Sequence, residues 1–95
     1  MSKKEAYEQK FEAQLNEWKA EADKLQAKAD KADADVRIKY HEQLEKLQAK
    51  EQETRVQLAQ LKNASEDSWQ DLKKGLEEAG NSLKKTFSSI KSNFS

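Results

Sequence analysis

The sequence predicts an all-α protein built around a coiled-coil seam, and three observations predict it. Proline is absent and glycine occurs only at Gly75 and Gly80, which disfavours folds that need many tight turns. Alanine, glutamate, lysine, glutamine and leucine dominate, and these residues lose least on entering a helix. The apolar residues recur every three or four positions, which places them on one helix face. Ordered helix is therefore favoured over sheet and over disorder.

The first apolar stripe predicts one long helix over residues 3–62, roughly 90 Å long at 1.5 Å per residue. Its steps mostly alternate between four and three residues, as in a coiled-coil seam. Two consecutive steps of four around Val36–Leu44 form a stutter, and the stripe becomes polar at Glu51 and Thr54. The predicted seam residues in this helix are Phe11, Leu15, Trp18, Leu25, Val36, Tyr40, Leu44, Leu47, Leu58 and Leu61.

A second stripe predicts a shorter return helix over residues about 65–94. Its seam residues are Trp69, Leu72, Leu76, Leu83, Phe87, Ile90 and Phe94. The segment Asn63-Ala-Ser-Glu66 has the spacing of a capping box, with Asn63 and Ser65 as alternative N-caps and Glu66 near the positive helix end. A turn at about 63–66 is therefore expected to separate the two helices.

The Asp30–Asp35 segment leaves an alternative architecture open. Aspartate is unfavourable inside a helix, but the alanines between the aspartates are the best helix formers. A break there divides the chain into segments near 3–31, 34–62 and 65–94 and predicts a three-helix bundle. Because the segment contains no glycine or proline, the continuous helix and a helical hairpin are preferred.

The hairpin predicts a single domain over residues 1–95 that associates with further chains. A narrow seam depends on packing for most of its stability. The return helix covers at most half of the long one, so the uncovered half calls for a second chain. We therefore expect self-association as a dimer or a larger oligomer, with the number and orientation of chains left open.

The sequence offers little for catalysis, metal binding or nucleic-acid binding. His41 is the one histidine and cysteine is absent, so no zinc ligand set is expected, and no cofactor is expected either. No phosphate-binding glycine loop or nucleophile–base pair occurs, so we do not expect an enzyme. Residues 1–62 carry 13 acidic and 13 basic side chains, interspersed, whereas nucleic-acid binding requires a basic surface.

The C-terminal segment leaves a membrane surface open as a partner. Residues 81–95 contain Lys84, Lys85 and Lys91 and no acidic residue, a pattern typical of interfacial helices. Continuity with the stripe from Trp69 to Leu83 favours a core face instead. The start of the chain lacks a secretory signal, and no stretch approaches the roughly 20 apolar residues of a membrane span. A cytoplasmic location is therefore expected.

The segment Ala64-Ser-Glu-Asp-Ser-Trp69-Gln-Asp-Leu-Lys-Lys-Gly75 resembles one found in a family of small bacterial coiled-coil stress-response proteins of the type first noted in cyanobacteria. The matching residues are Ser65, Trp69, Leu72, Lys73 and Gly75. The resemblance extends over about residues 10–90, and the tail departs from it toward Ser, Thr and Phe. It implies a cytoplasmic, non-enzymatic protein connected with stress.

Taken together, these features predict a non-enzymatic coiled-coil protein. It is expected to act through helix–helix contacts as a stress-associated scaffold or protective factor, with a protein partner that the sequence does not identify. The alternative is a peripheral membrane or lipid-surface protein that uses residues 81–95 as an amphipathic anchor.

Overall fold

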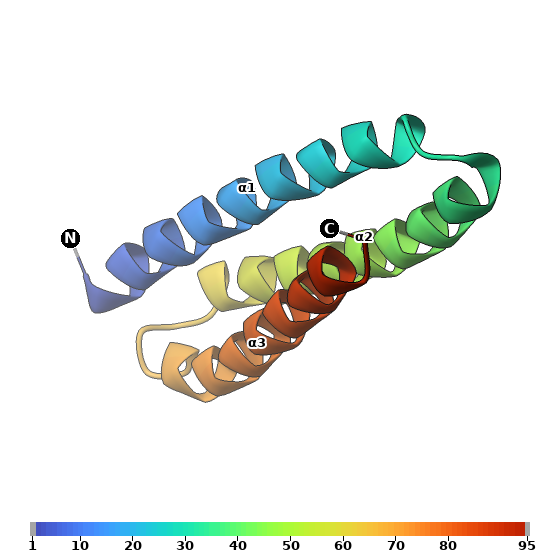
Figure 1. The fold of residues 1–95 in the computed structure, drawn as a ribbon. Coiled ribbons are helices and arrows are strands. Elements are labelled where there is room, and N and C mark those ends of the chain that lie inside the picture. The colour runs from blue at the N-terminus through green and yellow to red at the C-terminus, as the bar shows by residue number, and fades with distance from the viewer. Residues whose placement is uncertain (1, 95) are drawn as a thin grey trace.

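The computed structural model describes residues 2–94 and shows three helices and no strand within that range. They are α1 (Lys3–Asp30), α2 (Ala34–Lys62) and α3 (Trp69–Phe94). Figure 1 shows α2 returning antiparallel to α1 and α3 returning along α2, so that α1 and α3 run in the same direction. The molecule measures 51 × 19 × 18 Å. The predicted all-α class is confirmed, and the helices form a bundle.

The expectation of one continuous helix over residues 3–62 is wrong, because the chain turns at Lys31–Asp33. The amides of Lys31 and Ala32 donate to the carbonyl oxygens three residues earlier, at 3.2 and 3.1 Å, and thereby tighten the end of α1. Asp33 then adopts an extended conformation (φ −60°, ψ 155°) as the N-cap of α2. No residue of this turn has a positive φ, so the turn forms without glycine.

This turn also explains why Val36 does not lie on the seam. The buried residues of α2 alternate at steps of four and three from Tyr40 onward, and continuing the alternation backward reaches Arg37. Val36 precedes Arg37 by one position, so it points about 100° away from the stripe. Val36 is accordingly 43% exposed. The stutter in the sequence therefore marks a change of helix. The two halves now cover each other within one chain, which removes the original reason for a second chain, while self-association itself stays a prediction.

The second turn lies where it was predicted, but its residues have different roles. Asn63 is the C-cap of α2, with its amide donating to the carbonyl of Ala59, and not the N-cap of α3. Ser65 accepts hydrogen bonds from the Ser68 amide through both its side chain and its carbonyl oxygen. Residues 66–68, including the expected cap residue Glu66, form a turn, so α3 begins at Trp69 and not at 65.

The core follows the predicted stripes closely. Fifteen apolar residues form one buried cluster, and Tyr7, Trp18 and Ala64 pack against it. The buried residues are Phe11, Leu15, Ala22, Leu25, Ala29, Tyr40, Leu44, Leu47, Leu58, Leu61, Trp69, Leu76, Leu83, Phe87 and Ile90. A single contiguous core is consistent with the predicted single domain.

Two predicted seam residues of α3, Leu72 and Phe94, are not among the buried residues named above. Leu72 was expected in the core, but it is 38% exposed. The stripe of α3 steps four residues from Trp69 to the half-buried Lys73 and then to Leu76, which leaves Leu72 beside the core near the start of the helix. The side chain of Phe94 lies outside the described part of the structure.

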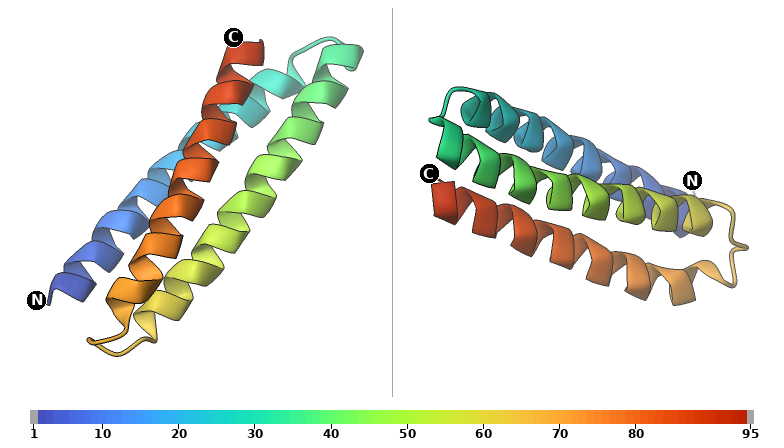
Figure 2. Two further views of the ribbon diagram at one scale, coloured as in Figure 1. Left: turned by 90° about the horizontal axis from the view of Figure 1, so that it is seen from below. Right: turned by 90° about the vertical axis from the view of Figure 1, so that its right-hand side faces the viewer.

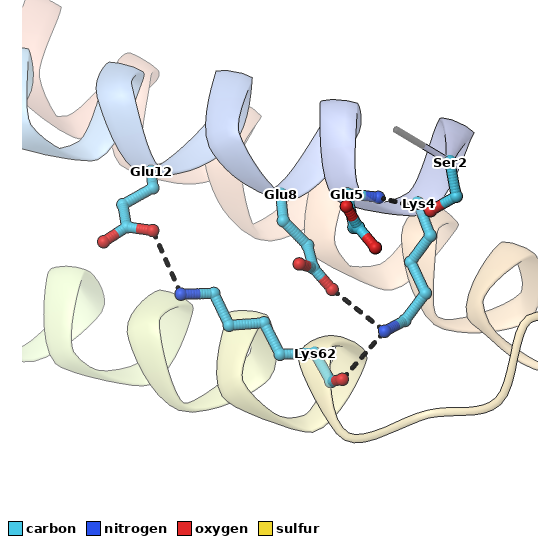
Figure 3. Close-up of polar contacts among 6 residues, drawn as sticks. All are labelled: Ser2, Lys4, Glu5, Glu8, Glu12 and Lys62. Atoms are coloured by element: carbon cyan, nitrogen blue, oxygen red, sulfur yellow. Dashed lines mark hydrogen bonds and ion pairs between the residues drawn. The ribbon is translucent and has the colours of Figure 1, made fainter.

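Polar contacts hold the start of α1 against the end of α2 (Figure 3). The Ser2 side chain caps α1 by accepting from the Glu5 amide at 3.1 Å. The Lys4 ammonium donates to the Lys62 carbonyl at 2.8 Å and lies 3.0 Å from a Glu8 carboxylate oxygen. It thus satisfies a carbonyl at the end of α2 that has no partner within its own helix.

Replacing Trp69 with alanine is expected to destabilise the bundle strongly. Trp69 is 6% exposed, and its ring lies 5.9 Å from that of Tyr7 across the α1–α3 contact. Truncating such a residue typically costs about 3–5 kcal/mol. The matched control is Val56→Ala, since Val56 is 57% exposed and surface changes usually stay within about 0.5 kcal/mol. Urea unfolding followed by circular dichroism measures both, and equal effects would contradict the core position of Trp69.

Candidate functional site

The described residues contain no arrangement suited to metal binding. No group of three or more His, Cys, Asp and Glu side chains comes together within residues 2–94. His41 lies near the first turn, with Nδ1 3.1 Å from the Gln26 amide nitrogen and Nε2 3.3 Å from an Asp30 carboxylate oxygen. It therefore links α2 to the end of α1. Among the same residues no helix is long and apolar enough to cross a membrane.

The most distinctive surface is a groove along α1 and α3, which we call the α1/α3 groove. It has three consecutive sections. The first is lined by Phe11, Trp18 and Gly80, among others, the second by Trp18 and Phe87, and the third by Leu25, Ala27 and lysines. Phe11, Trp18 and Leu25 are one heptad apart, so they share one face of α1 over 14 residues, roughly 21 Å.

Aromatic side chains line the first section of this groove or lie directly beside it. Phe11 and Trp18 meet edge to face with ring centroids 6.4 Å apart, and Tyr7 lies 6.0 Å from Phe11. The Lys73 ammonium lies 5.1 Å from the Tyr7 ring centroid and 5.7 Å from that of Trp69, within cation–π range. Trp18 remains only half-buried, so it contributes an apolar surface to the groove.

Gly80 is the point where α3 approaches these rings most closely. A Cβ atom at Gly80 would lie 3.0 Å from Cζ of Phe11 and 3.8 Å from Cη2 of Trp18, whereas one at Gly75 would meet nothing within 4 Å. The backbone of Gly80 therefore occupies space that a side chain would need. This supports close helix approach as the reason for Gly80 and leaves Gly75 without a packing role.

The charges along the groove are unevenly distributed. In the first two sections Glu77 and Glu17 accompany Lys84. The third section is lined by four lysines, Lys24, Lys28, Lys31 and Lys91, and one acid, Glu21. Glu21 lies 3.8 Å from the Lys91 ammonium across the two helices. The end of the groove beside the C-termini of α1 and α3 is consequently cationic.

The contacts of α2 with its neighbours are more polar. Arg55 donates to Glu51 at 2.9 Å and to Asn16 of α1 at 3.3 Å. The Thr54 hydroxyl donates to the Lys50 carbonyl at 2.7 Å, so both polar positions of the stripe are satisfied. The Lys50 ammonium donates to Ser82 and Thr86 of α3 at 3.0 and 2.9 Å. These contacts fix α1 and α3 against α2 and contain no exposed aromatic residue.

The sequence identified the groove only in part. Phe11, Trp18, Leu25 and Phe87 were predicted as seam residues and are brought together here. The sequence did not identify Gly80 and the lysines at 24, 28 and 31 as groove residues, because a position on a helix does not show what the next helix leaves uncovered. The spacing of those lysines by four and three is the signal that places them on one face.

Comparison with known proteins adds no family. No protein-family model, no curated protein and no solved structure matches the chain. The resemblance to bacterial stress-response proteins therefore stays a prediction.

Alanine substitutions at the two glycines are expected to differ. Gly75→Ala is expected to stabilise the protein by about 0.5–1 kcal/mol, because alanine loses less entropy in a helix. Gly80→Ala should gain less or destabilise, because its Cβ would press on Phe11. Thermal melts of the two variants provide the test, and an equal gain for both would contradict a close approach at Gly80.

Stability is expected to fall in alkaline solution through Tyr7. Burial, together with the negative charge of Glu77, raises the pKa of the Tyr7 hydroxyl to about 12. The folded protein thus keeps a proton that the unfolded chain releases above about pH 10, so this contribution is lost as the pH rises from 10 to 12. Burial raises the pKa of Tyr40 as well, so the comparison uses Tyr7→Phe alone. Urea unfolding at pH 8 and pH 11 should show a smaller loss for Tyr7→Phe than for the original chain.

Proposed function

We propose that the protein is a non-enzymatic interaction module that docks a partner helix in the α1/α3 groove. The observation that carries the proposal is the half-buried Trp18, which lies with Phe11, Gly80 and Phe87 in a groove between two parallel helices. Helix-in-groove recognition places the apolar face of an amphipathic helix in a hydrophobic groove, and Trp18 is the half-buried aromatic side chain that such a face could cover.

The bundle architecture supports a helix as the occupant. Figure 2 shows the three helices in up–down–up order, and four-helix bundles with short loops are a common arrangement that a further helix beside α1 and α3 would complete. The α1 residues that line the groove from Phe11 to Leu25 extend for roughly 21 Å, about four helical turns. Such a partner would bury Trp18 without disturbing the existing core.

A role in stress protection is part of this proposal only because Ser65 and the Trp69–Gly75 segment resemble the corresponding segment of small bacterial coiled-coil stress-response proteins. A scaffold that protects by binding other helices is compatible with a groove of this kind. Comparing the growth of cells with and without the protein under heat, salt and oxidative stress tests this part separately.

Site-specific photo-crosslinking in the producing cells tests the groove. We expect a photoreactive amino acid at Gln14 or Ser88, which line the groove, to form adducts in which the partner residues lie three or four positions apart. The matched control is Gln60, an exposed residue of α2, which should give none. Equal adducts from all three positions, or adducts to segments without helical spacing, would contradict the proposal.

A further inference from the structure

The cationic section of the α1/α3 groove carries charges that the bundle itself does not use. This third section has a volume of about 460 Å³ and is lined by Leu25 and Ala27 together with three lysines of α1. The lysines follow one another at steps of four and three residues, at Lys24, Lys28 and Lys31. Among the described residues, none of these three lysines lies within 4.0 Å of a carboxylate oxygen. Their charges are available to an acidic partner.

The lysines of this section could simply stabilise the C-terminal end of α1, but that interaction accounts for only some of them. Cations in the last turn of a helix stabilise its negative C-terminal end, and Lys28 is the residue of α1 in that position. Lys24 lies before the last turn, and the third section also includes Lys91, which α3 contributes from across the groove. Two helices thus direct lysines into one apolar section.

The direction of the helices adds a second constraint. α1 and α3 run parallel, so both of their C-terminal ends lie at the cationic end of the groove (Figures 1 and 2). A third helix in the groove is favoured electrostatically when its positive N-terminal end faces these negative ends. Acidic side chains are also most favourable near a helix N-terminus, and there they would meet the three lysines.

Resting on the proposed function, we infer that the partner is an amphipathic helix with an acidic N-terminal half that docks antiparallel to α1 and α3. Its acidic half lies over Lys24, Lys28 and Lys31, and its apolar face covers Leu25, Phe87 and Trp18. The first two sections contain both Glu and Lys, so its C-terminal half is uncharged or mixed.

The shape of the surface disfavours a second copy of this chain as the occupant. A symmetric dimer through the same surface would place groove against groove, so neither copy would offer a single exposed apolar helix to the other. The apolar face of α2, the one helix that already runs antiparallel to α1, is buried in the core of its own chain. A different chain with acidic residues fits the groove better.

Three synthetic helices of about 28 residues, the length of α1, test the inference. All share leucines at the first and fourth heptad positions. The first carries glutamates in its N-terminal half, the second carries the same glutamates in its C-terminal half, and the third has glutamine at every such position. Binding is measured by Trp18 fluorescence in a Trp69→Phe background, where Trp18 is the one remaining tryptophan.

The first helix is expected to bind about eightfold more tightly than the third, since three exposed ion pairs each contribute a factor of about two. The second helix should bind no better than the third. Lys24→Gln, Lys28→Gln and Lys31→Gln together should remove the difference, whereas the matched control Lys39→Gln, Lys46→Gln and Lys74→Gln, all exposed lysines outside the groove, should retain it.

The outcomes separate the two proposals. Equal binding of all three helices, or tighter binding of the second, overturns the acidic antiparallel partner but leaves helix docking intact. If none of them binds, both proposals fail. If sedimentation equilibrium instead shows a dimer of the 10.9 kDa chain that the triple glutamine variant strengthens, the occupant is a second copy and the inference is wrong.

Discussion

The whole structure depends on covering three narrow apolar stripes with one another. No helix of this chain has enough apolar surface to be stable alone, so each is held by packing. The first turn makes this possible within one chain, because it returns α2 against the face of α1 that a continuous helix would have left exposed. On that pair α3 docks with Leu76, Leu83 and Ile90, all at most 2% exposed. Every other feature follows from this arrangement.

The contact between α1 and α3 is the least uniform of the three. Near the start of α1, Tyr7 and Phe11 bridge to α3 through large rings, and Gly80 makes room for them. Toward its end, α1 offers the small residues Ala22 and Ala29 to the core, and lysine side chains line the space between the helices. The groove thus follows a contact in which α1 presents large aromatic rings near its start and alanines and lysines toward its end.

The sequence predicted the all-helical class and most of the core because a three–four pattern has one structural meaning over so many turns. It also indicated the second turn through Asn63–Glu66. It failed at Lys31–Asp33, where two backbone hydrogen bonds to carbonyl oxygens three residues earlier end α1 and the extended Asp33 starts α2. Composition favoured continuity there because alanine is the best helix former. The better signal was the stutter near Val36, which lies just after the turn between the two helices.

The groove was harder to predict than the core. A stripe residue such as Trp18 is indistinguishable in sequence from Leu15, although the first is half-buried and the second fully buried. The difference depends on the size of the side chains that α3 presents opposite each residue. Likewise, Lys24, Lys28 and Lys31 have the spacing of an ordinary solvated helix face, and only the fold places Lys91 across from them.

The same packing bears on the alternative in which residues 81–95 anchor the protein to a membrane. The apolar face of α3 is already buried, so insertion would first require detaching the helix from the bundle. A bilayer would replace the burial that Leu83 and Ile90 lose. It would not replace the burial of Phe11, whose ring lies against Gly80 of α3, and full exposure of such a side chain costs about 1.5–3 kcal/mol. Contact with an anionic surface through the exposed Lys84 and Lys85 of a docked α3 would avoid this cost.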